Sequence, residues 1–277
     1  MPAAVVPGCE MEYGGKEQGR PEPKGSPVLS KRLDRILSMI RPGELLADIG
    51  TDHAYVPIAA VTRGLCRRAL ACDIVPGPLI HARENIAEAG LEEQIEVRQG
   101  DGLQPLGEER PDRIVIAGMG GPLMEKILTE GREKIRPGAS LILSPQSGWM
   151  EFRMYLRECS FRIRREVMLE EDGKYYLILD CERESIPFEK PAQRPGELRY
   201  GDAALYLPED LEVRRTYLRK ELATAKTIEE QLKGNNSPAA ETRCRELVTL
   251  IEDADWALEE TDRCLQAAGA PDGEQEN

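Results

Sequence analysis

Short apolar runs alternate with amphipathic helical patterns through the middle of the 277-residue chain, and this alternation restricts the fold more than any other feature. A short apolar run between turn residues is typical of a buried strand, whereas apolar residues spaced three and four apart are typical of a helix. Strands joined by helices form a parallel sheet with helices on both faces. The predicted strands span 45–49, 69–72, 95–98, 113–117 and 140–143, and the predicted helices span 30–40, 55–63, 78–89, 122–130 and 151–159.

Two further strands complete the predicted sheet. They span 161–168 and 175–181 and flank the turn Glu171-Asp172-Gly173. Because two strands joined by a tight turn pair as an antiparallel hairpin, we expect this hairpin at one edge of the sheet. The predicted fold class is therefore α/β, with a seven-stranded Rossmann-like sheet.

Composition divides the rest of the chain into separate regions. Residues 1–27 are rich in glycine, proline and charge without periodicity, which predicts a disordered extension before a domain that spans 28–183. Residues 184–208 are rich in proline and predict a linker. A helical hairpin is predicted over 209–268 and a disordered tail over 269–277.

The second helix of the predicted hairpin has apolar residues at strict four-three spacing, which is the period of a coiled coil. The short break between the two helices makes them antiparallel neighbours. Two interpretations stay open: a brace packed on the sheet domain, or an arm that grips RNA or forms a dimer. Because the second helix is acidic, the first would face RNA, and its basic residues are Arg214, Arg215, Arg219 and Lys220.

The charge balance argues against a general nucleic-acid-binding protein, because the formal net charge is −13. A polyanion would have to dock on local basic clusters such as those at 162–165 and 214–220. No apolar run is long enough to cross a membrane, and the N-terminus lacks a signal pattern, so we expect a cytoplasmic protein. Two histidines and no CxxC pair predict no metal site.

The turn after the first predicted strand carries the clearest chemical signal. Asp48 and Asp52 flank Gly50 there, and His53 follows. Two carboxylates beside a glycine suit a cationic, nucleoside-bearing cofactor, since the carboxylates can hold an ammonium group and glycine permits close backbone approach. The absence of GxGxxG at this turn argues against a dinucleotide cofactor.

Carboxylates also end the next two predicted strands. Asp73 can accept hydrogen bonds from both hydroxyls of a ribose, and Asp101 can accept from an adenine amino group. In open α/β sheets a ligand lies beyond the carboxyl ends of the strands. The combination predicts an S-adenosylmethionine (SAM) site, to which Gln99, Gly100, Gly102 and Met119 also contribute.

The loops after the fourth and fifth strands are candidates for the methyl acceptor. Gly118, Met119, Gly120 and Gly121 follow the fourth strand and predict close backbone approach to methyl donor and acceptor. After the fifth strand, Ser144, Pro145 and Gln146 offer hydroxyl, carbonyl and amide groups to a base edge. Tyr55 and His53 are candidates to stack on the base.

These motifs together resemble the bacterial tRNA (adenine-22-N1)-methyltransferase family, the TrmK type, among the class I SAM-dependent methyltransferases. The resemblance covers about residues 29 to 181, and the helical hairpin fits the family plan. In this chain Ser144-Pro145-Gln146 stands where the family has Gln-Pro-Asn. The matching segments are 29–33, 47–55, 97–103, 116–122 and 169–175.

The resemblance implies methyl transfer from SAM to N1 of adenine 22 in tRNA. Neutral adenine N1 carries a free lone pair, so we expect catalysis by positioning and charge stabilisation without an essential general base. Two alternatives stay open: a class I methyltransferase acting on ribosomal RNA, protein or a small molecule, and a non-catalytic SAM- or RNA-binding adaptor. The sequence also leaves open whether the protein is a monomer or a weak dimer.

Overall fold

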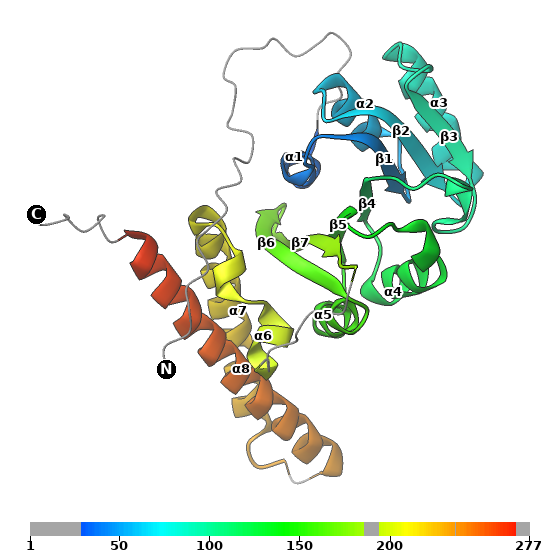
Figure 1. Ribbon diagram of the computed structural model, residues 1–277. Coiled ribbons are helices and arrows are strands. Elements are labelled where there is room, and N and C mark those ends of the chain that lie inside the picture. Colours follow the sequence, from blue (N-terminus) through cyan, green and yellow to red (C-terminus); the bar gives the residue numbers. More distant parts are fainter. Residues whose placement is uncertain (1–28, 186–193, 236, 270–277) are drawn as a thin grey trace, which may run out of the picture.

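The computed structural model describes residues 29–185, 194–235 and 237–269. The predicted extension (1–27) lies outside these ranges, and so does the predicted tail (269–277) except for residue 269. Seven strands form one sheet in the order β3-β2-β1-β4-β5-β7-β6 (Figure 1). This order and the parallel pairing of β1 to β5 confirm the predicted Rossmann-like plan. The strands are β1 (Gly43–Ile49), β2 (Cys66–Asp73), β3 (Ile95–Gln99), β4 (Arg113–Ala117), β5 (Ser140–Ser144), β6 (Phe161–Glu171) and β7 (Lys174–Arg183).

Helices cover both faces of the sheet. The side chains of β4 and β5 alternate between two cores: Ile114 and Leu141 point to one, and Val115 and Ile142 to the other. Successive side chains of a strand point to opposite faces, so both faces of these strands are buried. One face packs against α1 (Lys31–Met39), α2 (Tyr55–Thr62) and α3 (Pro76–Glu88), and the other against α4 (Gly121–Glu130), α5 (Trp149–Glu158) and the short helix η1 (Gln104–Leu106).

The element boundaries follow local signals in most places. Helix α1 begins after Ser30, whose Oγ accepts a hydrogen bond from Leu33 N at 3.3 Å, as the predicted N-cap requires. Strands β6 and β7 pair antiparallel around the turn at Asp172-Gly173, so the predicted edge hairpin is confirmed. Both turn residues have positive φ, of 52° and 75°.

The region predicted to be a linker is partly folded, so that prediction is wrong for residues 195–206. It contains α6 (Pro195–Tyr200) and the short helix η3 (Ala203–Leu205), with Tyr200 and Tyr206 buried. Pro195 stands in the first turn of α6, where its missing N–H costs nothing, so this proline begins a helix.

A buried ion pair attaches this region to the sheet domain. Arg153 of α5 and Glu166 of β6 are only 3% and 1% exposed, and their closest atoms are 2.7 Å apart. Tyr206 donates its hydroxyl to Glu166 at 3.0 Å, and Arg153 Nη1 donates to Arg199 O at 2.9 Å. One carboxylate therefore joins α5, β6 and the segment that leads to the arm.

The arm consists of α7 (Pro208–Leu232) and α8 (Pro238–Gly269), which lie against each other on the β6 side of the sheet (Figure 1). Ion pairs join Arg215 to Asp262 at 3.6 Å and Lys226 to Asp255 at 3.6 Å. The residue number rises from Arg215 to Lys226 along α7 while that of its partner falls from Asp262 to Asp255 along α8, so the two helices are antiparallel. A helical hairpin is what the four-three spacing predicts.

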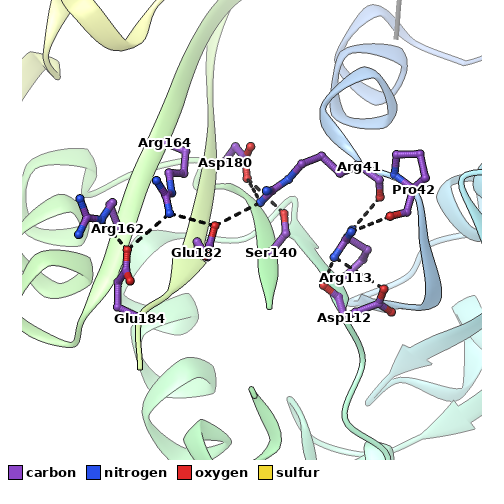
Figure 2. A network of polar contacts seen from close by, with 10 residues as sticks. All are labelled: Arg41, Pro42, Asp112, Arg113, Ser140, Arg162, Arg164, Asp180, Glu182 and Glu184. Carbon is purple, nitrogen blue, oxygen red and sulfur yellow. Dashed lines mark hydrogen bonds and ion pairs between the residues drawn. The ribbon is translucent and has the colours of Figure 1, made fainter. Parts of the chain in front are cut away.

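Figure 2 shows a polar network at the amino ends of β4 and β5, which begin at Arg113 and Ser140. Arg162 and Arg164 of β6 pair with Glu184 at 2.5 Å and Glu182 at 3.2 Å (Figure 2). Arg41 lies 3.8 Å from Glu182. The basic cluster that the sequence presents in β6 is therefore engaged by carboxylates at the edge opposite to the predicted cofactor site.

We expect Glu166→Gln to lower the free energy of unfolding by about 3 kcal/mol, because the buried Arg153 would lose its counter-charge. Urea unfolding followed by circular dichroism measures the change. Glu88→Gln, on the exposed side of α3, is the matched control and should change stability by less than about 0.5 kcal/mol. An equal effect of both substitutions would contradict the role of Glu166.

Candidate functional site

The turn between β1 and α2 brings polar atoms and exposed backbone together. Gly50 has a φ of 78°, and a Cβ there would come within 2.7 Å of Met119 Cε from the loop after β4. The Oγ1 atom of buried Thr51 makes no hydrogen bond of regular geometry among the described residues, and it interacts only loosely with the Asp48 carboxylate. A buried hydroxyl that is bonded so weakly can also bind a ligand.

Asp48 is a buried carboxylate at the end of β1. It is 7% exposed, and burial raises its pKa to about 6, opposed by a weak hydrogen bond from the Thr51 side chain and helped slightly by the charge of Asp73. No ion pair of Asp48 occurs in the parts of the chain that the structure describes. A buried carboxylate without a cation is a site for a cationic ligand, since the cation would stabilise its ionised form.

The residues after this carboxylate adopt a backbone conformation that is rare outside glycine. His53 and Ala54 have φ angles of 61° and 56°, and Asn85 of α3 donates to His53 O at 2.9 Å, which holds the turn. The His53 ring stacks between Tyr55 and His81, with centroids 5.3 and 5.2 Å away. Such strain concentrates at functional sites.

Asp52 is exposed beside this stack. Its Oδ1 lies 3.3 Å from His53 Nε2, and its side chain is 74% exposed. The turn therefore carries one buried carboxylate, at the end of β1, and one exposed carboxylate.

The ends of β2 and β3 lie side by side. Gly100 N donates to Asp73 O at 3.0 Å, and Gln99 Nε2 donates to Ile74 O at 3.2 Å. Asp73 Oδ1 accepts from Val75 N at 2.7 Å, which leaves its other oxygen for a ligand. The structure therefore places Asp73 and the Gln99–Gly102 loop together, as the sequence predicts.

Asp101 occupies the outer part of the same loop. It is half-buried, and its Oδ2 lies 3.9 Å from Lys126 Nζ of α4. Gly102 has a φ of 52°, and a Cβ there would come within 3.3 Å of Ile127. Helix α4 thus bounds the loop on one side.

The loops after β4 and β5 form one wall. Gln146 N donates to Met119 O at 3.0 Å, and Gly121 N donates to Ser147 O at 2.9 Å. A Cβ on Gly120 would come within 2.9 Å of Ser147 Oγ, and one on Gly121 within 2.8 Å of Ser147 O. Glycine is therefore required here by the close approach of two loops, and Gly118 has a φ of 82°.

The base-edge role predicted for Ser144 does not fit its position. Its side chain is buried, and its hydroxyl donates to Leu177 O of β7 at 2.9 Å. Pro145 is buried as well, and its carbonyl accepts from Trp149 Nε1 at 2.9 Å. Gln146 is exposed, so it is the one member of this triplet whose side chain stays available to a substrate.

The RNA-binding role predicted for Arg214 is also wrong. The side chain is 0% exposed, and it donates to Gly201 O at 3.0 Å, to Ala257 O at 3.1 Å and to the Thr261 hydroxyl. Arg214 therefore joins α7 to α8 and to the end of α6.

The other basic residues of α7 differ in exposure. Arg215 is held by Glu212 and by Asp262, whereas Arg219 and Lys220 are exposed. Lys220 Nζ lies 5.5 Å from the centre of the Tyr175 ring, so α7 presents positive charge beside the β6–β7 hairpin.

Three features of the site have no role in the sequence interpretation. They are the weakly bonded hydroxyl of Thr51, the indole of Trp149 at the start of α5, which donates to Pro145 O, and Arg32 of α1, which lies over Tyr176. Arg32 falls within a segment that carries the family resemblance, which is the one signal that points to it. Contacts between distant segments place all three.

The arrangement fits a SAM cofactor. Asp48 and the Thr51 hydroxyl can hold its ammonium group, Gly50 leaves room for its methionine, and Asp73 can hold its ribose. In the described ranges no three His, Cys, Asp or Glu side chains gather as metal ligands. No helix within those ranges is both long and apolar enough to cross a bilayer.

Known proteins are similar to this chain in sequence and structure. The family described as TrmK, tRNA (adenine(22)-N(1))-methyltransferase, matches residues 46–254. The tRNA (adenine(22)-N(1))-methyltransferase of Bacillus subtilis is 42% identical over 154 residues, which are 56% of this chain and 65% of that protein. The chain thus spans just under two thirds of that relative in sequence.

Solved structures match over more of the chain. The crystal structure of the B. subtilis m1A22 tRNA methyltransferase TrmK has a TM-score of 0.73 at 32% identity, covering 83% of this chain and 99% of that one. A putative tRNA (m1A22) methyltransferase of Streptococcus pneumoniae, in complex with SAM, has a TM-score of 0.70 at 32% identity, covering 83% of this chain and 100% of that one.

We expect Asp48→Asn to raise the stability of the ligand-free protein at pH 7.5 by about 2 kcal/mol, because it removes a buried, unpaired charge. The folded-state pKa is raised, so the ionised carboxylate destabilises the fold above pH 6, and this penalty vanishes as the pH falls below about 4. Urea unfolding at pH 7.5 and 4.5 tests this, and Asp52→Asn is the exposed control. A destabilised Asp48→Asn at both pH values would contradict it.

Proposed function

The chain belongs to the TrmK family of tRNA (adenine(22)-N(1))-methyltransferases, and on this basis we propose that it transfers a methyl group from SAM to N1 of adenine 22 in tRNA. The main support is the family match over residues 46–254 together with a buried, unpaired carboxylate at the end of β1. The similarity to a SAM-bound Streptococcus pneumoniae structure supports the cofactor.

The three carboxylates at the strand ends would each bind a different part of SAM. The ionised Asp48 carboxylate would hold the ammonium group of SAM, with the Thr51 hydroxyl as a second partner. Asp73 would accept hydrogen bonds from the ribose hydroxyls, and Asp101 would accept one from the adenine amino group. Gly50 and Met119 border the methionine, because the Met119 side chain lies against Gly50.

When bound, SAM supplies an electrophilic methyl group on a sulfonium. During transfer the lone pair of adenine N1 would form the new C–N bond, while the C–S bond would break and leave its electron pair on sulfur. Backbone hydrogen bonds from Gly121 N and Gln146 N join the loops after β4 and β5. The joined loops would hold the acceptor base in line with the methyl group. The exposed Gln146 amide is available to the base edge.

No proton has to be removed from adenine N1 before the transfer, so the chain's acids and bases act in binding and positioning. Positive charge would move from sulfur to the base. Met119 O and Gly120 O already accept backbone hydrogen bonds from Gln146 N and Met124 N, so the Gly118 carbonyl is the group of the Gly118–Gly121 loop that would stabilise this charge. The half-buried stack of His53 and Tyr55 would border a base that has left its helix.

The arm provides a place for tRNA on an acidic protein. Arg219 and Lys220 are exposed on α7 beside the β6–β7 hairpin, which projects from the carboxyl edge of the sheet. Arg214 stabilises the arm from within and takes no part in docking.

We expect the purified protein with labelled SAM to form N1-methyladenosine at position 22 of unmodified tRNA, as mapped by nucleoside mass spectrometry. Asp48→Asn and Asp73→Asn should raise the SAM dissociation constant at least tenfold. In the wild type this constant should rise as the pH falls below about 6, since Asp48 becomes protonated. The turnover number at saturating SAM should stay nearly constant above pH 7.

A tRNA whose position 22 is guanine is the matched control substrate. Label in another RNA, a protein or a small molecule, with tRNA unlabelled, would replace the proposed acceptor and retain the cofactor site. If the protein binds SAM but methylates neither RNA, protein nor small molecules, it would be a non-catalytic adaptor.

A further inference from the structure

Arg32 extends from the first turn of α1 toward the carboxyl edge of the sheet. Its guanidinium lies over the Tyr176 ring of β7, 5.3 Å from the ring centre. Its Nη1 atom is buried, and it has no hydrogen-bond partner among the described residues. A buried guanidinium nitrogen without an acceptor is costly, which points to a ligand that completes it.

The carboxylates around α1 are engaged by other groups. Glu171 accepts from the backbone N of Lys31 at 2.5 Å, Asp34 pairs with Arg63 at 2.8 Å, and Asp210 pairs with Arg35. No ion pair of Arg32 occurs in the ranges that the structure describes. The guanidinium therefore keeps its positive charge available.

The unpaired nitrogen lies beside the proposed methyl-acceptor loop. Arg32 Nη1 is 4.0 Å from the place where a Cβ on Gly118 would lie. Gly118 follows β4 and begins the loop that the proposed function assigns to the acceptor base. A ligand atom seated against Gly118 would therefore be within reach of the guanidinium.

The charge of the reaction indicates which part of the nucleotide Arg32 holds. Adenine becomes positively charged as it is methylated, so a cation on the base edge would oppose the transfer. A phosphate is negative throughout, and a planar guanidinium binds it through two parallel hydrogen bonds. The cation–π contact with the Tyr176 ring holds the guanidinium at this place.

We propose that Arg32, held over the ring of Tyr176, binds a backbone phosphate of the nucleotide that is methylated and so positions it beside Gly118. This inference rests on the proposed function, because it assumes an RNA acceptor. It adds an anion subsite on α1 to a site otherwise built from the loops of the sheet.

The test compares Arg32→Gln with the wild type in tRNA binding over 50 to 300 mM salt, and in methylation and SAM binding. We expect the Michaelis constant for tRNA to rise at least tenfold, and the slope of log affinity against log salt to decrease by about 0.7 to 0.9, as for the loss of one phosphate contact. The SAM dissociation constant should change less than twofold.

Three further variants separate binding from folding. Tyr176→Phe keeps the aromatic face and should behave like the wild type, whereas Tyr176→Leu should reproduce part of the Arg32→Gln defect. Arg67→Gln removes the same charge from a side chain that is 77% exposed at the start of β2, on the opposite edge of the sheet. It should leave the Michaelis constant and the salt slope unchanged.

Each other outcome has a defined meaning. A wild-type protein that leaves tRNA unmethylated overturns the proposed function, and the phosphate subsite with it. If the wild type methylates tRNA while Arg32→Gln keeps its salt slope, the subsite alone is overturned. A lower turnover number with an unchanged slope would assign Arg32 to the base edge, and an equal loss of SAM affinity would make its role structural.

Discussion

Parallel pairing of β1 with its two neighbours is the constraint on which the site depends. Ile49 pairs with Cys72 of β2 and with Ile116 of β4, so these strands end at the same edge of the sheet. Asp73 pairs with Gln99 in the same way. Polar residues that are far apart in the chain therefore meet at one edge. Backbone hydrogen bonds hold them there before any ligand contributes.

This edge carries groups that the folded protein stabilises poorly by itself. Asp48 is a buried carboxylate with a raised pKa, Thr51 has a hydroxyl that only weakly bonds that carboxylate, and Arg32 has an unpaired guanidinium nitrogen. His53 adds a strained backbone conformation. Such groups reduce stability in the ligand-free protein, and a charged cofactor and substrate would satisfy them. Function and stability thus make opposite demands on the same few residues.

The arm is part of the same structure as the site. Trp149 donates to Pro145 O on the acceptor loop, and its ring lies 5.8 Å from that of Tyr217 on α7. The Tyr217 ring is 5.1 Å from Tyr175, which follows the β6–β7 turn. Aromatic packing therefore connects the helical hairpin to a wall of the site, and the buried pair of Arg153 and Glu166 secures the segment between them. A surface that docks RNA on α7 would be held in a defined position relative to the acceptor loop.

The sequence by itself determined the alternation of strands and helices, the N-cap at Ser30, and the carboxylates at the strand ends, because these depend on local spacing and on the common edge of a parallel sheet. Only the tertiary structure decided which polar side chains stay accessible. Arg214 is buried because α8 and the end of α6 surround it, and Ser144 because β7 accepts its hydroxyl. The contact between Arg32 and Tyr176 joins α1 to the last strand. Burial and pairing of this kind arise from segments distant in sequence, and no local pattern records them.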